Sequence, residues 1–173
     1  MKKIKLIINN GNKKKEHKSV LRVIANSFLW NLIKLDIRDS PLWRLAYPKP
    51  YWSLVKKYSS KAGIDPFFAL AIMREESHFD PMALSTSKAM GLMQLMPATA
   101  KEVAKKKKIE ILNQEKIFDH TINIPLGIFY LGQIARKFQS ELIYTAGSYN
   151  AGPHNMKKWL NRWNGVTIDK FVE

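Results

Sequence analysis

The sequence predicts a mainly α-helical domain that begins near residue 44, behind a short basic helical extension. Apolar residues recur at three- and four-residue spacing in several segments, which is the period of an α-helix. Proline, glycine and aspartate separate these segments, as they do between helices. No segment shows the alternation typical of a strand, although a short hairpin within residues 82–95 is an alternative. The 173 residues suffice for one such domain.

The first segment of the chain is basic. Residues 1–19 are rich in Lys and Asn and are predicted to form a mobile tail. The apolar run from Ile4 to Ile8 is broken by Lys5 and is shorter than a secretory signal requires, so no signal peptide is predicted. An amphipathic helix is expected at 20–37, either packed on the domain or lying on a membrane surface. No stretch is apolar for long enough to span a membrane.

Two helices open the domain. After a stretch punctuated by prolines, residues 52–62 have the apolar spacing of a helix. Asp65 is expected to cap the next helix, with Pro66 at its first position. That helix should continue over 67–79, until Asp80-Pro81 stops it.

The remaining segments follow the same pattern. Residues 82–91 are rich in Ser and Thr and are predicted to form a loop. Further helices are expected at 97–107, 123–138, 141–149 and 155–163.

Charge and composition narrow the function. The chain holds 29 Lys and Arg against 14 Asp and Glu, a formal net charge of +15. This surplus favours an anionic partner, which could be nucleic acid, an acidic membrane surface or an acidic polymer such as cell-wall glycan. Cysteine is absent, which excludes disulfides and any cysteine nucleophile or cysteine metal site.

Glu76 is a carboxylate on an apolar helix face. Successive helical residues step about 100° around the axis, which places Ala69, Ile72, Met73 and Phe79 within roughly 60° of Glu76. A carboxyl group among apolar side chains has a raised pKa, because its charged form loses solvation. A carboxyl that is protonated near neutral pH is what cleavage of a glycosidic bond needs. The alternative is that Glu76 makes a buried hydrogen bond or ion pair and has no catalytic role.

Two further segments combine helix-breaking Gly or Pro residues with amide or hydroxyl side chains. Gly91-Leu92-Met93-Gln94 follows the flexible loop, and Tyr149-Asn150-Ala151-Gly152-Pro153 ends an apolar helix. Taken singly, the first is also explained as a turn and the second as a helix stop.

Together these segments resemble the catalytic domain of the soluble lytic transglycosylases, which has a lysozyme-like fold. The resemblance covers residue 44 to the end of the chain. It rests on four segments in the family's order, which are Glu76-Ser77, Gly91 to Pro97 with Thr99-Ala100, Asn123-Ile124 with Gly127 and Tyr130-Leu131, and Tyr149 to Pro153.

The resemblance implies roles for individual residues. Glu76 matches the single catalytic acid/base, and Tyr149 matches a tyrosine whose hydroxyl reaches that carboxyl, with Asn150 as its conformational support. Ser85 matches a serine that orients the reacting sugar or the carboxyl. Gln94 and Met96 match groove residues that contact the glycan.

The implied substrate is peptidoglycan, cleaved at the MurNAc-GlcNAc β-1,4 bond to leave 1,6-anhydro-muramic acid ends. Most glycosidases use two carboxylates. Here Glu75 faces away and Asp80 lies beyond the helix stop, so a second one is not found. No metal or cofactor is expected, and His78, His120 and His154 are not at ligand spacing. A monomer is expected, in the periplasm or cell envelope where the implied substrate lies, and the basic N-terminus could bind an anionic membrane or wall surface.

The sequence also departs from the family pattern. Lys88 stands where the family usually has a small residue. The expected domains are 1–43, a basic tail and helix, and 44–173, a transglycosylase domain that stops at Glu173, where the family continues. These departures favour, as an alternative, a truncated remnant that binds peptidoglycan with weak or no activity.

Two other functions remain alternatives. A lysozyme-type hydrolase would leave reducing muramic ends in place of anhydro ends. A nucleic-acid binder is suggested by net charge alone, and no recognition motif accompanies the Lys runs, so no nucleic-acid partner is expected.

Overall fold

The computed structural model describes residues 47–162. Two compact units are distinguished, residues 1–50 and residues 51–173. The predicted tail, the helix at 20–37, the boundary between residues 43 and 44 and the final residues 171–173 lie outside the described residues.

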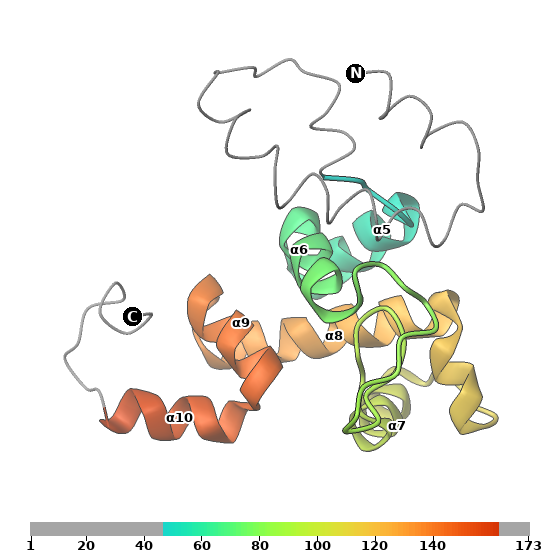
Figure 1. Cartoon of the computed structure of the whole chain (residues 1–173). Coiled ribbons are helices and arrows are strands. Elements are labelled where there is room, and N and C mark those ends of the chain that lie inside the picture. Colours follow the sequence, from blue (N-terminus) through green and yellow to red (C-terminus); the bar gives the residue numbers. More distant parts are fainter. Residues whose placement is uncertain (1–46, 163–173) are drawn as a thin grey trace, which may run out of the picture. The chain divides into compact units, whose positions relative to one another are not determined.

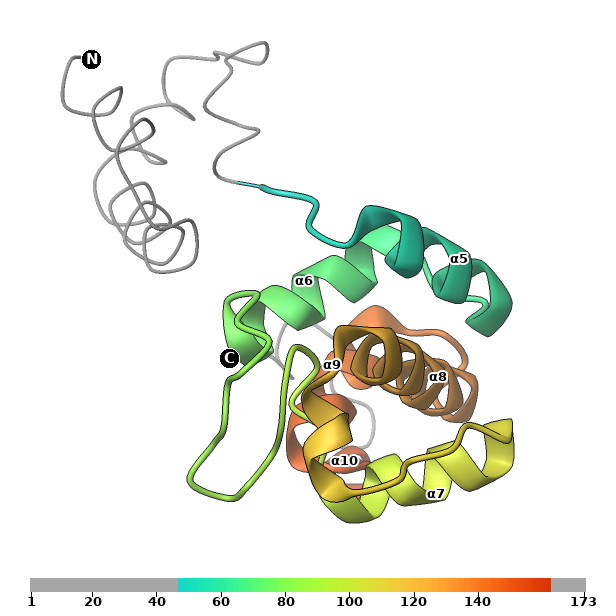
Figure 2. The same cartoon turned by 90° about the vertical axis from the view of Figure 1, so that its right-hand side faces the viewer.

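The described part of the second unit is helical. Its elements are α5 (Trp52–Ala62), α6 (Pro66–Ser77), α7 (Pro97–Lys107), the short 3-10 helix η1 (Gln114–Phe118), α8 (His120–Lys137), α9 (Leu142–Ala151) and α10 (Pro153–Arg162). Figures 1 and 2 show α8 between α5 and α6 on one side and α7 on the other. The predicted mainly α-helical fold is therefore confirmed. Within residues 47–162, the hairpin alternative is realised only as two isolated bridges, Leu84 with Met90 and Met90 with Leu95.

The bounds of α6, α9 and α10 differ from the prediction by one or two residues, and the start of α8 differs by three. Helix α6 ends at Ser77, not at residue 79, because His78 and Phe79 adopt left-handed backbone conformations with φ of 51° and 63°. The His78 amide donates to the Arg74 carbonyl and closes the last turn. Phe79 therefore leaves the helix face on which it was predicted to lie beside Glu76.

Helix α8 begins three residues earlier than predicted. The Asp119 carboxylate accepts a hydrogen bond from the Thr121 amide at 2.8 Å and caps the helix. As a result, Asn123 lies in the first turn and Pro125 in the second, beyond the position that proline prefers. The short helix η1 was not predicted.

The start of α6 follows the sequence signals closely. The Asp65 carboxylate accepts hydrogen bonds from the amides of Phe67 (2.7 Å) and Phe68 (3.0 Å), and Pro66 occupies the first turn. The helix axis is therefore fixed at the end opposite to Glu76.

Removal of this cap has a measurable expected effect. The Asp65→Ala variant leaves two amides at the α6 N-terminus without their acceptor, which should reduce the free energy of unfolding by about 1 kcal/mol. Asp65→Asn retains an acceptor oxygen and should lose less. Urea denaturation of both variants measures the difference, and equal stability of Asp65→Ala and the parent chain would contradict this role.

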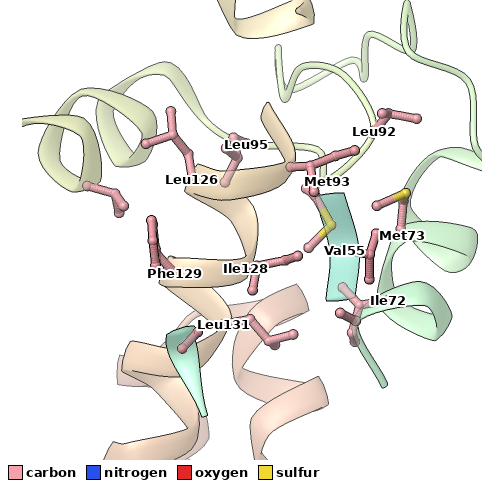
Figure 3. Close-up of a cluster of buried hydrophobic side chains, with 14 of the residues drawn as sticks. Val55, Ile72, Met73, Leu92, Met93, Leu95, Leu126, Ile128, Phe129 and Leu131 are labelled. Atoms are coloured by element: carbon pink, nitrogen blue, oxygen red, sulfur yellow. The ribbon is translucent and has the colours of Figure 1, made fainter. Parts of the chain in front are cut away.

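Helix α8 forms the centre of the core. Buried α8 side chains pack against α5, α6, α7 and the loop before α7; they include Ile124, Leu126, Ile128 and Leu131. Figure 3 shows Met93 of this loop beside Ile128 of α8, with Met73 of α6 nearby. At Gly127 a Cβ atom would lie 2.5 Å from the Met93 side chain, so the glycine allows the loop to approach the helix closely.

Among the described residues, no helix combines the length and apolar character needed to cross a bilayer.

Candidate active site

Glu76 lies in the last turn of α6, among buried side chains. As predicted from the helical period, Ala69, Ile72 and Met73 are buried on this helix. The side chain of Glu76 itself is partly buried, whereas its neighbour Glu75 is exposed. Helix α6 thus separates the two adjacent acids, one towards solvent and one towards the core edge.

The Glu76 carboxyl has a raised pKa of about 6. Burial is the larger cause, because it removes solvation from the charged form, and the nearby Glu75 carboxylate adds to it. Within residues 47–162, the Glu76 carboxyl takes part in no hydrogen bond or ion pair. The alternative role for Glu76, a buried hydrogen bond or ion pair, is therefore not supported by any contact within residues 47–162.

The raised pKa makes stability depend on pH in a defined direction. Folding favours the protonated form of Glu76. The contribution of this group to the free energy of unfolding is therefore fully present below the unfolded pKa of 4.5 and is lost as pH rises through about 6. Glu76→Gln removes this titration. The variant should gain stability relative to the parent chain between pH 5 and about 7. Denaturant midpoints of both proteins across this range measure the gain, and a constant difference would contradict the raised pKa.

Tyr149 is a second predicted site residue, and its pKa responds to the charge of Glu76. The Tyr149 hydroxyl, on α9, donates a hydrogen bond to the Met93 carbonyl at 2.7 Å. Its pKa is raised well above the usual value, first by burial and then by the Glu76 carboxylate and Tyr130. The ring of Tyr130, on α8, lies 5.5 Å from that of Tyr149. The two side chains Glu76 and Tyr149 therefore share one electrostatic environment, although 73 positions separate them in the sequence.

The Gln94 side chain braces the loop between α6 and α7. Its Nε2 donates to the carbonyls of Ala83 (3.0 Å) and Gly91 (2.9 Å). The backbone of Gln94 has φ of 43°, and the residue lies in the turn that brings Leu95 back beside Met90. Both amide hydrogens are engaged by the protein, which leaves the Oε1 atom as the polar group available to a ligand.

Ser85 is tied to its own turn. Its hydroxyl oxygen accepts a hydrogen bond from the Ala89 amide at 2.8 Å, and its carbonyl accepts one from the Lys88 amide at 2.9 Å. Lys88 has φ of 64°, a conformation that favours glycine. Glycine would adopt the backbone of this turn with less strain than the lysine that stands there.

The other two predicted residues are exposed. Met96 occupies the N-cap position of α7 without a side-chain hydrogen bond, and the residue is 43% exposed, which leaves it accessible to a ligand. Asn150 is exposed in the last turn of α9, beside Tyr149. Of the six predicted residues, Glu76 and Tyr149 are linked by the effect of the Glu76 charge on the pKa of Tyr149, and Gln94 lies in the loop that Tyr149 contacts.

Two buried polar residues that had no predicted role hold this loop. Asn123 Nδ2 donates to the carbonyls of Met90 (2.9 Å) and Ile117 (2.8 Å), and its Oδ1 accepts from the Met93 amide at 2.7 Å. An asparagine between two isoleucines, Ile122 and Ile124, is the sequence signal that could have identified it.

Ser77 holds the same loop from α6. Its hydroxyl donates to the Leu92 carbonyl at 2.8 Å and lies 3.1 Å from the Met73 carbonyl. Because Ser77 directly follows Glu76, this contact fixes the loop relative to the carboxyl.

Asp80, just beyond the end of α6, is bound to its own turn. The Asp80 carboxylate accepts a hydrogen bond from the Met82 amide at 3.0 Å, and its charge raises the pKa of Tyr51 in addition to the larger effect of burial. In the described part of the chain, no three His, Asp or Glu side chains are close enough together to hold a metal ion.

The fold and the site define a class. A helical domain with one partly buried acid in the last turn of α6 has a lysozyme-like organisation. The chain matches the Transglycosylase SLT domain family over residues 53–172, and it belongs to that family.

Individual relatives agree with this assignment. The chain is 32% identical over 165 residues to the soluble lytic murein transglycosylase of Escherichia coli, a match that covers 92% of the chain and 26% of the relative. The solved 70-kDa soluble lytic transglycosylase of E. coli superposes with a TM-score of 0.72 and 31% identity, over 96% of this chain and 28% of that one. An inactive mutant of the lytic transglycosylase Slt from Pseudomonas aeruginosa, in which one glutamate is replaced by glutamine, also superposes with a TM-score of 0.72. It is 26% identical, and the match covers 91% of this chain and 26% of that one.

These relatives are longer proteins. The chain spans about a quarter of the length of the E. coli relative, so the similarity concerns one of its regions.

Proposed function

We propose that the chain is a peptidoglycan lytic transglycosylase that cleaves the MurNAc-GlcNAc β-1,4 bond without water, with Glu76 as its single acid/base. The observation that carries the proposal is the partly buried Glu76 carboxyl, which has a pKa of about 6 and no partner within residues 47–162. Such a group is protonated in a useful fraction of molecules near neutral pH and is ionised in the rest.

The proposed reaction uses one proton twice. Glu76 transfers its proton to the glycosidic oxygen as the bond from that oxygen to the anomeric carbon of MurNAc breaks. The resulting carboxylate then accepts the proton of the C6 hydroxyl of the same sugar, whose oxygen attacks the anomeric carbon. The products are a GlcNAc end with a free hydroxyl and a 1,6-anhydro-muramic acid end, and Glu76 is again protonated.

A single acid is compatible with the surroundings of Glu76. The exposed Glu75 and the turn-bound Asp80 leave no evident second carboxylate at the site among the described residues. Inverting and retaining glycosidases generally need two. The names of the relatives, murein transglycosylases, and the inactive glutamate-to-glutamine mutant among them, support the same reading.

The other predicted residues receive roles within this proposal. Tyr149 adjusts the Glu76 carboxyl, and Asn150 supports Tyr149. The glycan is contacted by Gln94, through its Oε1 atom, and by the exposed Met96. The hydroxyl of Ser85 orients the reacting sugar or the carboxyl. By this proposal the protein works in the periplasm or cell envelope, where its polymer substrate lies.

Digestion of purified peptidoglycan tests cleavage against binding alone. The purified chain should release soluble muropeptides, measured by liquid chromatography, at a rate proportional to enzyme concentration. Co-sedimentation with the insoluble polymer measures binding in the same samples. Binding without release would replace the proposed activity by that of a peptidoglycan-binding remnant.

A further inference from the structure

Basic and acidic residues are distributed unevenly over the helices of this domain. Helices α5, α7 and α8 hold three, four and two lysine or arginine residues, and between them a single acid, Glu102. Helix α6, by contrast, holds two acids and one arginine. Figures 1 and 2 show α8 between α5 and α7, so the three acid-poor helices are neighbours. Positive charge is therefore concentrated on one group of adjacent helices.

The single acid of these helices is already neutralised. The Lys106 ammonium lies 2.6 Å from a Glu102 carboxylate oxygen. This hydrogen bond and the Lys106 charge, with a smaller effect of Lys137, lower the pKa of Glu102. Within residues 47–162, no ion pair joins any other lysine of the three helices to an acid. Their charges are thus available to an outside anion.

Two aromatic rings gather three of these lysines. Tyr58 of α5 and Phe129 of α8 make an edge-on contact, with ring centroids 5.6 Å apart. The Nζ atoms of Lys57 and Lys61 lie 5.5 Å and 5.6 Å from the Tyr58 centroid. The Nζ atom of Lys107, on α7, lies 4.3 Å from the Phe129 centroid. Because the face of a ring attracts an ammonium group, the ring pair holds these three exposed lysines, the lysine cluster, near one another.

The chemistry of the lysine cluster favours an acidic polymer over a lipid bilayer. Every exposed large apolar residue of the described chain lies outside α5, α7 and α8. Helices that lie in a membrane surface present apolar side chains beside their basic ones. Lysine is also a point charge, without the planar fork with which arginine grips one fixed anion. It suits single charges spread along a polymer, and the peptide stems of peptidoglycan carry such charges as free carboxylates.

We propose that the lysine cluster is a second binding surface for peptidoglycan, at which its ammonium groups contact carboxylates of the peptide stems. The choice of polymer rests on the proposed function, whereas the binding itself needs no cleavage. A second contact with the same polymer keeps the protein near its substrate when a cut strand leaves the Glu76 site.

Co-sedimentation with insoluble peptidoglycan measures this binding, in a Glu76→Gln chain that should leave the polymer uncut. Joint replacement of Lys57, Lys61 and Lys107 by glutamine removes three charges and should weaken binding about tenfold at low salt. The difference should shrink at high salt, which screens exposed charges. Joint replacement by arginine keeps the charges and their attraction to the rings, so this variant should bind as the parent chain does. A loss with arginine equal to that with glutamine would contradict a role for charge.

The matched control replaces Lys116, Lys157 and Lys158 by glutamine. It removes the same net charge from exposed positions outside the three helices, on η1 and α10. Binding should stay close to that of the parent chain. Equal losses in the two glutamine variants would overturn the proposal, because net charge alone would then set the affinity.

The partner's chemistry is tested with peptidoglycan whose carboxylates have been converted to amides. On this polymer the parent chain and the lysine-cluster glutamine variant should bind equally, and a persistent difference would overturn the proposal. Vesicles of anionic phospholipid provide the other source of negative charge. Dependence on the lysine cluster with vesicles but not with peptidoglycan would assign this surface to a membrane and also overturn the proposal.

The same samples separate this proposal from the proposed function. If binding depends on the lysine cluster but the chain with Glu76 intact releases no muropeptides, the proposed function fails and the binding surface stands. If muropeptides are released but binding does not depend on the cluster, the binding surface fails and the proposed function stands.

Discussion

Replacement of Glu76 by glutamine should reduce glycan turnover about a thousandfold, within the range of about 10²–10⁴ that a general acid contributes. Glutamine has nearly the same shape as glutamate, but it has no proton to give and no carboxylate to take one back. Binding of peptidoglycan should survive, because the size of the side chain is preserved. Initial rates of muropeptide release, together with co-sedimentation, measure the two effects separately.

Glu75→Gln is the matched control for this substitution. Glu75 has the same chemistry and is adjacent in sequence, but it is exposed on the other side of α6. Its replacement removes only a minor contribution to the pKa of Glu76, so turnover should stay within a few-fold of the parent value. Comparable losses in the two variants would contradict a distinct role for Glu76 as the acid.

Substitution of Gly91 by alanine should have the largest effect on stability among the single-methyl changes considered. Gly91 has φ of +74°, which alanine adopts only with strain. The added Cβ would also lie 2.5 Å from Asn123 Nδ2 and 3.2 Å from the Ile117 carbonyl oxygen. Strain of about 1–2 kcal/mol and overpacking of about 1–3 kcal/mol together predict a loss of about 2–5 kcal/mol.

Gly63→Ala separates the two causes. Gly63 has a similar φ of +70°, but no atom lies within 4 Å of a Cβ placed there. Its replacement should therefore cost only the backbone strain, about 1–2 kcal/mol. Urea denaturation of both variants gives the difference. Equal losses would mean that the close packing of Gly91 on Asn123 contributes nothing.

Local signals in the sequence predicted much of the helical framework. Asp65 and Pro66 marked the start of α6 correctly, because an N-cap carboxylate and a first-turn proline act on neighbouring amides. The helical period also identified the buried face of α6 beside Glu76. It failed at Phe79, because His78 and Phe79 take left-handed conformations without the glycine that usually signals them.

The site could be predicted only in part. The anomalous position of Glu76 follows from the helical period alone, and family resemblance added Tyr149. The bond from Tyr149 to Met93 spans 56 positions, and no local pattern encodes such a contact. The same holds for Asn123, whose bonds to the loop depend on how closely Gly91 and Gly127 let the chain approach α8.

The mass of the newly formed sugar ends tests the central claim most directly. Peptidoglycan digested by the purified chain would be analysed by mass spectrometry for muramic acid ends. A single acid/base that uses the C6 hydroxyl predicts 1,6-anhydro ends, each lighter by one water than a reducing end, and predicts that they vanish with Glu76→Gln. Reducing ends formed by the parent chain would instead reveal hydrolysis and contradict the account.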